Sequence, residues 1–385
     1  MRSGCVCYSL TLPVVLFLMM ISCVKKQAGW QGSLAYEDGV TVVRNPSIPL
    51  NLGPLILLRE QFYLDRQLVE RGLSRIRDFA VDSSGNVFFL AFHPETDFVY
   101  KFDPEGRFLK SFICKGPGSG ELQDAQRLQI NARDELTLHD PSGHRLHVYD
   151  TEGRLQEKIV LEPDVRHINR LADGGYLISR FIPASPAAGG DSLAVVLCDQ
   201  RLTDTKELIR YELDDRDFRD GRIEGGIDAF YWTVTGDRIH VGTDDHGYEI
   251  LVFDLAGNLL RKIRKDYLPV PYPEQFRRSF YTAWQSHPQV RIDFPQYLPP
   301  FHAFFVGAEG RLFVQTFEPG TEPDTWIHDI FDTEGVFIGR QGLRIVWRGG
   351  SLGLYTHALQ REGRLYCLRA GEGGCRTFVV YRLLT

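Results

Sequence analysis

Arginine and histidine side chains recur in five of the six copies of a repeated sequence unit, shortly before its first turn. This position carries Arg77 and Asp78, then Arg127, then Arg166 and His167, then His302, and finally His357. If the copies of the unit surround a central channel, these side chains converge at its mouth. Hydrogen-bond donors gathered there concentrate positive potential, even in a chain whose formal net charge is -6. These residues therefore predict a site for a carboxylate, a phosphate or an acidic sugar. The alternative is that they bind backbone carbonyls or pair with Asp78 and neighbouring carboxylates.

A second set of side chains has the chemistry of metal ligands. The segment 243–246 (Thr-Asp-Asp-His) and the pair Asp140 and His144 occupy matching loops of two units. Clustered carboxylates and imidazoles bind divalent ions such as calcium. The alternative is a solvated turn, because Asp is common in turns. The sequence thus predicts no resident cofactor and leaves a divalent metal open.

Catalytic motifs are scarce in this sequence. The segment 349–353 (Gly-Gly-Ser-Leu-Gly) matches the Gly-x-Ser-x-Gly pattern, whose serine needs a strand, a sharp turn and a helix to present it. We expect this segment in a loop between units and assign it no catalytic role. No HExxH, CxxC, Walker or GxGxxG motif occurs, so zinc-hydrolase, thioredoxin and nucleotide-binding functions have no support.

The elements that position these side chains follow from a repeated phrase. It consists of an aromatic or aliphatic residue, Asp, a short turn that usually contains Gly, and then alternating apolar and charged residues. Its copies are 102–107, 149–154, 198–199, 253–258 and 331–336. Each copy predicts a β-hairpin, and a second hairpin precedes it. Six units of four strands, repeating at roughly 50 residues, indicate an all-β, six-bladed β-propeller.

Two segments complete the predicted architecture. The sixth unit runs out of sequence after a third strand at 377–382, so we expect the N-terminal segment 55–64 to supply its fourth strand and close the ring. Residues 264–300 interrupt the repeat between blades 4 and 5, and their proline-free centre, 274–286, predicts a short helix. In a propeller, such an insert lies on the face of the loops between second and third strands, which commonly binds ligands.

Composition agrees with this fold class. The chain of 385 residues is 43% hydrophobic and 24% charged, with 25 Phe and 16 Tyr beside 37 Gly and 20 Pro. These values exclude a disordered chain and a protein with several membrane spans. The acidic balance excludes nucleic acid as a partner.

The N-terminus has the pattern of an export signal. Residues 10–21 are uncharged and almost wholly apolar, a run too short for a permanent membrane span. The segment that ends at Cys23 resembles a bacterial lipobox. This segment predicts a signal peptide over 1–22 and lipidation of Cys23 as the mature N-terminus. The domain boundaries that follow are a tether over 23–53 and the propeller over 54–385. Plain secretion and an uncleaved anchor are the alternatives. We expect a cell-envelope protein on the periplasmic or outer-membrane side, attached to the membrane only through this N-terminus.

Two other cysteines flank a predicted hairpin turn. Cys367 and Cys375 lie on either side of this turn and face each other if the two strands pair. An oxidising compartment would allow a disulfide between them. Two reduced cysteines on packed strands are the alternative.

The repeat resembles that of NHL-repeat propellers. Segments 81–88 (VDSSGNVF) and 145–153 (RLHVYDTEG) match its phrase. Residues 43–46, 115–121 and 294–301 are similar to segments of bacterial lipoproteins described as 6-bladed β-propeller proteins. The resemblance covers about residues 39–383 and is weakest in units three and four. It implies the fold and export, and it supplies no catalytic motif.

Two functions are compatible with these observations. The first is a monomeric, non-catalytic binding or scaffold protein that presents the channel mouth and the insert to a protein, a peptide or an anionic glycan. The second is a metal-dependent hydrolase or lyase, similar to propeller lactonases, with its site in the central channel. Such an enzyme needs two or three carboxylate, Asn or His ligands at the axis. The aligned positions hold mostly arginine, so the sequence favours binding over catalysis.

Overall fold

The computed structural model of this chain describes most of the sequence beyond residue 28. The described residues are 29–64, 68, 70, 73, 76–91, 98–113, 116, 121–184, 190–213, 222–224, 230–286, 290–307, 309–323, 325–345, 358–370 and 376–384. The chain has two units, Met1–Trp30 and Gln31–Thr385, and the fold given below is that of the second unit. The predicted signal peptide and Cys23 lie outside the described residues.

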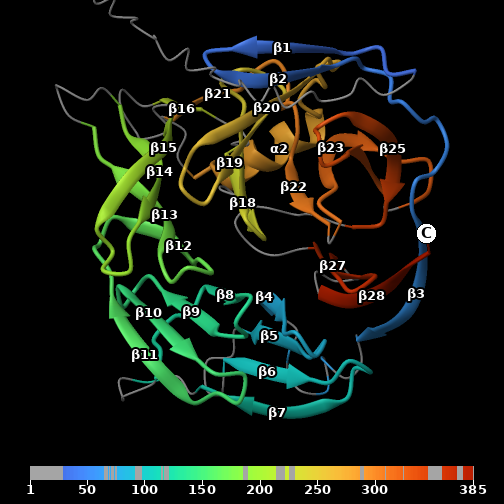
Figure 1. The fold of residues 1–385 in the computed structure, drawn as a ribbon. Helices are drawn as coiled ribbons and strands as arrows, with labels where there is room; N and C mark the ends of the chain where they lie inside the picture. Colours follow the sequence, from blue (N-terminus) through green and yellow to red (C-terminus); the bar gives the residue numbers. More distant parts are fainter. Residues whose placement is uncertain are drawn as a thin grey trace, which may run out of the picture. The chain divides into compact units, whose positions relative to one another are not determined.

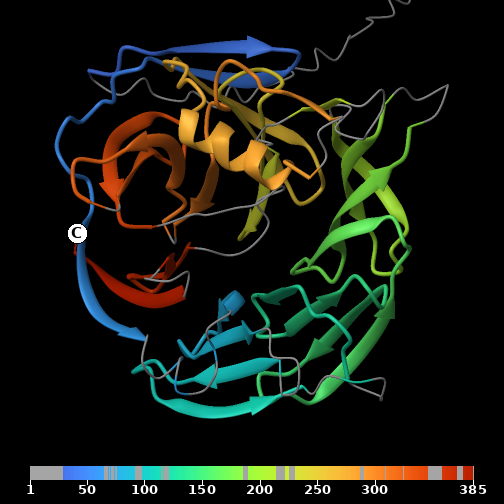
Figure 2. The same cartoon turned by 180° about the vertical axis from the view of Figure 1, so that it is seen from behind.

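The second unit is a ring of six antiparallel blades, which confirms the predicted β-propeller (Figures 1 and 2). Blade 1 contains β4 (Ile76–Val81), β5 (Val87–Ala91), β6 (Val99–Phe102) and β7 (Phe108–Phe112), and blade 2 contains β8 (Arg127–Ile130), β9 (Leu136–Asp140), β10 (Arg145–Tyr149) and β11 (Leu155–Val160). Blade 3 contains β12 (Val165–Arg170), β13 (Tyr176–Ile182), β14 (Ser192–Cys198) and β15 (Asp204–Glu212). In blades 1 and 2, the first strands lie near the centre of the ring and the last strands at its rim (Figure 1).

The other three blades continue the same pattern. Blade 4 contains β17 (Tyr231–Thr235), β18 (Arg238–Thr243), β19 (Glu249–Asp254) and β20 (Leu259–Lys265). Blade 5 contains β22 (Ala303–Val306), β23 (Leu312–Pro319), β24 (Trp326–Phe331) and β25 (Phe337–Leu343). Blade 6 contains β26 (Ala358–Arg361), β27 (Arg364–Ala370) and β28 (Arg376–Leu384), and its fourth strand is β3 (Leu57–Leu64).

The ring closes as the sequence predicts, through the N-terminal strand. β3 pairs antiparallel with β28, and the register runs from Leu64 opposite Phe378 to Leu57 opposite Leu384. Phe378 also contacts two rings of blade 1, with centroids 5.2 Å from Phe79 and 4.7 Å from Phe89. The last blade is therefore joined to the first by packing as well as by its borrowed strand.

Part of the predicted tether over 23–53 is a β-hairpin. β1 (Ser33–Glu37) and β2 (Val40–Asn45) extend blade 4 to six strands, and β2 pairs in parallel with β20. The side chain of Asn45 crosses to blade 5, where it donates to the carbonyl of Gly335 at 2.9 Å and accepts the N–H of Phe337 at 2.8 Å. The hairpin therefore covers the rim of blade 4 and links it to blade 5.

The repeated Asp of the phrase fixes each hairpin turn. Asp103 Oδ1 accepts the N–H groups of Glu105 and Arg107, two and four residues later. The same pattern occurs at Asp82, Asp150, Asp199 and Asp332. These carboxylates satisfy backbone donors that the tight turn leaves unpaired, so the phrase is explained by turn chemistry.

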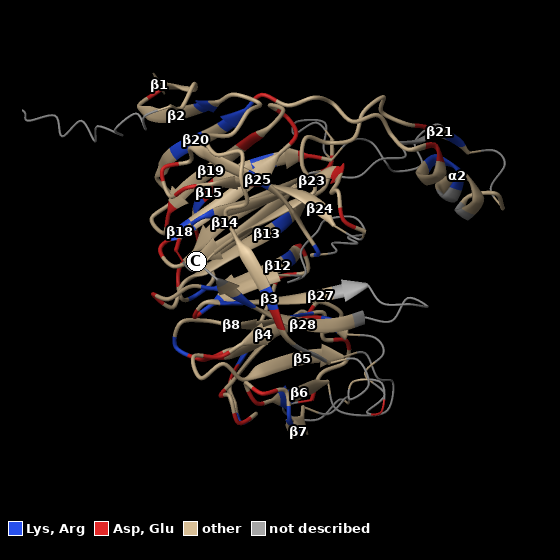
Figure 3. Cartoon of the chain, turned by 90° about the vertical axis from the view of Figure 1, so that its right-hand side faces the viewer, with Lys and Arg blue, Asp and Glu red and all other residues tan. Residues whose placement is uncertain are grey.

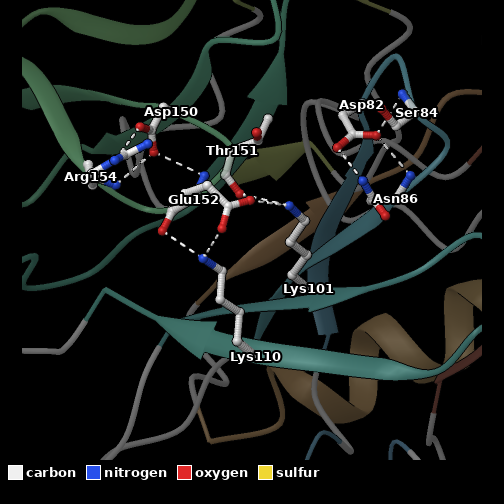
Figure 4. A network of polar contacts seen from close by, with 9 residues as sticks. All are labelled: Asp82, Ser84, Asn86, Lys101, Lys110, Asp150, Thr151, Glu152 and Arg154. Carbon is white, nitrogen blue, oxygen red and sulfur yellow. Dashed lines mark hydrogen bonds and ion pairs between the residues drawn. The ribbon is translucent and has the colours of Figure 1, made fainter.

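Basic side chains clamp the turn of the following blade. Lys101 Nζ of blade 1 donates to the carbonyl of Thr151 and to the carboxylate of Glu152 in blade 2, and Lys110 also binds Glu152 (Figure 4). Arg261 of blade 4 repeats the arrangement on blade 5, where it binds the carbonyl of Thr333 and the carboxylate of Glu334. Charge pairing thus supports the apolar contact between blades.

The predicted insert 264–300 lies between blades 4 and 5. It contains α2 (Glu274–Ala283) and β21 (Arg291–Asp293), which pairs in parallel with β16 (Arg222–Glu224). The ring of Phe294 contacts Phe276 and Phe280 of the helix. α2 and β21 lie to one side of the stacked blades (Figure 3). Within the described residues, no helix is long and apolar enough to cross a membrane.

Candidate ligand-binding site

A cavity of ≈ 470 Å³ lies among the first strands of all six blades. Each of these strands, β4, β8, β12, β17, β22 and β26, contributes residues to its wall. Volumes of this size accommodate small ligands. Because every blade contributes to its wall, the cavity occupies the position of the channel expected at the centre of a propeller.

The lining of this cavity is rich in hydrogen-bond donors. Its polar and aromatic members include Arg127, Arg170, Arg361, Gln129, Asn169, Gln360, Tyr231 and Trp232. Among the described residues, none of those that line the cavity is Asp, Glu or His. Guanidinium, amide and indole groups recognise oxygen acceptors, so the chemistry of the wall suits an oxygen-rich or anionic ligand.

The three arginines of the wall differ in how their charge is compensated. Arg361 donates to the carbonyl of Val81 at 2.6 Å. Arg170 donates from Nη1 to Glu157 at 2.6 Å, and its Nε lies 3.4 Å from Glu135. Arg127 has a longer contact, 3.8 Å from its Nε to the carboxylate of Asp78. Arg170 thus has close carboxylate partners, Arg127 has only the longer contact with Asp78, and the described contact of Arg361 is with a backbone carbonyl.

Two buried donors of the wall have no hydrogen-bond partner within the described part of the chain. They are Arg127 Nη1 and Trp232 Nε1. Neither atom can accept a hydrogen bond. A buried donor without a partner costs free energy, so each such group requires an explanation such as a water, an ion or a ligand. Both atoms call for an acceptor.

Two histidines lie beside Arg127. His139 is opposite Arg127 in the register of β8 and β9, and His167 lies on the next blade, in β12, which lies against β9. Burial and, to a smaller extent, the charge of Arg127 lower the pKa of His139 to about 4. Burial, Arg127 and His139 likewise hold the pKa of His167 well below its usual value. Both rings are therefore neutral at pH 7.

The predicted channel-mouth residues have varied surroundings. Arg77 pairs with Asp124 at 2.5 Å and donates to the carbonyl of Ala125 at 2.8 Å. Asp78 is fully buried and accepts the N–H groups of Phe79 and Leu128. These contacts agree with the alternative given in the sequence analysis, in which the side chains bind backbone groups or pair with neighbouring carboxylates.

The remaining members of that set also have neighbours of their own. Arg166 is exposed, lies over the ring of Phe181 and donates to a backbone carbonyl. His302 lies beside the ring of Phe317, with centroids 5.0 Å apart, and burial lowers its pKa to about 4. His357 lies outside the described residues. Arg127 is the one described member that lines the cavity.

Sequence reasoning missed most of the cavity wall. Gln129, Asn169, Trp232 and Gln360 lie within or at the end of the first strands, downstream of the position at which the units were aligned. His139 lies on a second strand, where an alternating pattern predicts only burial. The sequence does show apolar and polar residues alternating along each first strand. This alternation indicates which residues share one face of the strand, but it does not indicate that six such strands line one cavity.

The predicted metal ligands have structural partners where they are described. Asp140 accepts the N–H groups of Gln123 and Gly143, so both of its oxygens serve the backbone. Asp244 accepts the hydroxyl of Tyr211. In the described part of the chain, no group of three or more His, Cys, Asp or Glu residues is placed to hold a metal ion. The segment 349–353 lies outside the described residues.

The predicted disulfide involves one described residue. Cys367 lies opposite Val379 in the register of β27 and β28. Cys375 lies outside the described residues, so the pairing of these two cysteines stays a prediction.

Comparison with known proteins identifies the fold. No protein-family model and no curated protein matches this sequence. A presumed exported protein from Bacteroides fragilis is similar in structure over 89% of this chain and 100% of its own, with a TM-score of 0.51 and 9% identity. A member of the DUF4221 family from Bacteroides vulgatus is similar over 86% of this chain and 99% of its own, with a TM-score of 0.51 and 12% identity. At these identities the likeness concerns the fold alone, a six-bladed β-propeller.

Proposed function

We propose that this protein is an exported binding module that holds an oxygen-rich ligand in the central cavity of its propeller. The observation that carries the proposal is the donor-rich wall, in which Arg127 Nη1 and Trp232 Nε1 are buried without a hydrogen-bond partner in the described part of the chain. Carboxylate, phosphate or sugar oxygens of a ligand would satisfy these donors. An anionic glycan or an acidic peptide has this chemistry.

Location at the cell envelope is the second part of the proposal. The apolar run 10–21 and the lipobox-like segment ending at Cys23 support export and a lipid anchor. The similar structure from Bacteroides fragilis is also a presumed exported protein. An anchored propeller would present its cavity to ligands outside the cytoplasm.

Binding has more support than catalysis. A metal-dependent hydrolase or lyase needs carboxylate or imidazole ligands that converge on the channel. The described wall offers arginine, amide, hydroxyl and aromatic groups instead. This donor set can orient an anionic or oxygen-rich group and has few groups that could hold a metal.

A ligand screen with cavity variants tests the proposal. The chain without its predicted signal peptide, residues 24–385, is screened by thermal shift against neutral sugars, acidic sugars, sugar phosphates and acidic peptides. A ligand at a hundred times its Kd stabilises by about 2.7 kcal/mol. We expect Asn169→Leu and Gln360→Leu to abolish the shift, and Tyr36→Ala on β1, at the rim of blade 4, to retain it. A shift that survives both cavity substitutions would place the ligand elsewhere and contradict the proposal.

A further inference from the structure

Three buried nitrogen atoms at the boundary of blades 2 and 3 have no hydrogen-bond partner in the described part of the chain. They are Arg127 Nη1, His139 Nε2 and His167 Nδ1. His139 is only 2% exposed. Buried polar groups in folded proteins are almost always hydrogen-bonded, to protein or to a bound molecule. These three nitrogens are therefore available to hydrogen-bond a bound group.

The topology brings these three side chains together. Arg127 and His139 are register partners on neighbouring strands of blade 2, so their side chains leave the same face of the sheet. His167 lies on the first strand of blade 3, close enough to Arg127 and His139 for their charges to affect its pKa. Arg127 also lines the central cavity, which connects this cluster to the proposed binding site.

The acidic groups near the cluster leave Arg127 Nη1 unsatisfied. Asp78 lies 3.8 Å from Arg127 Nε, and its two oxygens accept the backbone N–H groups of Phe79 and Leu128. Asp140, the residue after His139 in β9, interacts electrostatically with it, and the oxygens of Asp140 also accept backbone N–H groups. These carboxylates are committed to the backbone of the scaffold.

The other charged groups near the cluster are basic or titratable. His144 interacts electrostatically with His139, and Arg166 interacts with His167. Cationic forms of these groups oppose protonation of the two buried rings. A negatively charged ligand would reverse that balance, because it favours the protonated form of a nearby imidazole.

We propose that Arg127, His139 and His167 form an anion pocket that receives the carboxylate or phosphate group of the ligand. The inference rests on the proposed function, because the rest of such a ligand would occupy the central cavity. Arg127 supplies a permanent positive charge, and the two imidazoles supply N–H donors once the anion is bound. The cluster thus gives the cavity a preference for acidic over neutral ligands.

Binding of an anion in this pocket is coupled to proton uptake. Both imidazoles are neutral in the free protein, and a bound anion stabilises their protonated forms. By linkage, the affinity for the anion rises as the pH falls. For each proton taken up, the affinity changes by up to about tenfold per pH unit.

Calorimetric titration of residues 24–385 with sulfate and, separately, with acetate tests the pocket. Sulfate represents a phosphate group and acetate a carboxylate, and neither changes charge between pH 6 and 8. We expect at least one of them to bind, and to bind more tightly at pH 6 than at pH 8. Non-specific stabilisation by sulfate does not interfere, because the heat of binding is measured directly.

Substitutions that keep charge or polarity identify the site. Arg127→Lys retains the charge and removes the planar guanidinium, and His167→Asn retains a polar group that does not titrate. Each is expected to weaken anion binding by about tenfold, or ~1.4 kcal/mol. The control is Arg154→Lys, which changes an exposed arginine in the outer hairpin turn of the same blade, away from the cavity wall, and should leave the affinity unchanged. A circular dichroism melt of each variant verifies that it is folded.

The outcomes separate this inference from the proposed function. If neither anion binds the wild-type protein, or if Arg154→Lys weakens binding as much as Arg127→Lys, the anion pocket is wrong. A ligand from the thermal-shift screen that depends on Asn169 and Gln360 would then still support the cavity as a binding site. If the anions bind equally well at both pH values and His167→Asn has no effect, the two histidines are not part of the pocket and the inference is overturned.

Discussion

Lys110 of blade 1 donates hydrogen bonds to both the backbone oxygen and the carboxylate of Glu152 in blade 2, at 2.9 and 2.6 Å. Lys101, whose side chain is only 8% exposed, binds the other carboxylate oxygen at 2.7 Å. The hydrogen bonds from Lys101 and Lys110 lower the pKa of Glu152 to about 2. One carboxylate thus compensates two ammonium groups at the interface between blades.

Removal of this carboxylate charge should destabilise the propeller. Glu152→Gln leaves the buried ammonium of Lys101 without its anionic partner, and we expect the free energy of unfolding to fall by about 1–3 kcal/mol. Urea denaturation measures the change. The control is Glu105→Gln in the equivalent turn of blade 1, where the carboxylate contacts only the exposed Arg107 in the described structure, at 3.3 Å. Equal losses in the two variants would contradict the role of the clamp.

Buried neutral histidines should make the fold sensitive to acid. Burial lowers the pKa of His328 to about 4, and the side chain is only 1% exposed. Because this pKa lies below the unfolded value of 6.5, the stabilisation is present above pH 6.5 and is lost as the pH falls towards 4. Between pH 7 and pH 4.5, the free energy of unfolding should therefore fall by about 2 kcal/mol less in His328→Gln than in the wild type.

Urea denaturation at the two pH values measures this difference. The matched control is His246→Gln, which replaces an exposed histidine in a loop of blade 4. This variant should show the same loss of stability as the wild type. If His328→Gln also behaved as the wild type, titration of the buried ring would not contribute to acid unfolding.

Gly335 should tolerate no side chain. Its φ is +79°, and a Cβ atom there would lie 2.7 Å from Cγ1 of Ile263 in the preceding blade. We expect Gly335→Ala to lower the free energy of unfolding by about 2–4 kcal/mol, because backbone strain and the steric clash add. Gly363 has a similar φ of +71° and no atom within 4 Å of such a Cβ. Gly363→Ala should cost only the strain, about 1 kcal/mol, and equal effects would disprove the packing argument.

Asn45 should contribute more stability than its position in a predicted tether suggests. Asn45→Ala removes two buried hydrogen bonds with blade 5 and leaves the N–H of Phe337 unpaired. We expect a loss of about 2 kcal/mol in urea denaturation. The control is Asn51→Ala, which removes one exposed hydrogen bond to the carbonyl of Ile338. A loss in Asn45→Ala no larger than in this control would show that the buried hydrogen bonds of Asn45 add no more stability than an exposed one.

The sequence predicts the propeller well because its signals are local. The turn Asp and Gly of each phrase act within five residues, and alternation of apolar residues marks the strands on both sides. The need for a fourth strand in blade 6 followed from counting strands, and β3 supplies it. The hairpin of β1 and β2 was missed because its pairing with β20 joins residues more than two hundred positions apart.

The candidate site is harder to predict because it depends on which side chains already have partners. Arg77 and Arg127 both lie at the start of a first strand, but Arg77 is paired with Asp124 at 2.5 Å whereas Arg127 has only the longer contact with Asp78. This difference arises from the loop before β8 and has no counterpart in the repeat. The sequence thus indicates where cations gather, and the three-dimensional contacts decide which of them can receive a ligand.

The pairing of β3 with β28 also governs the order of events during synthesis. These strands are separated by more than three hundred residues, so β3 leaves the ribosome long before its partner exists. Blades 1 to 5 can form their own hairpins as they emerge, whereas β3 stays exposed until the C-terminal strands arrive. If the chain is exported as proposed above, its final fold is reached only after nearly all of the polypeptide has crossed the membrane.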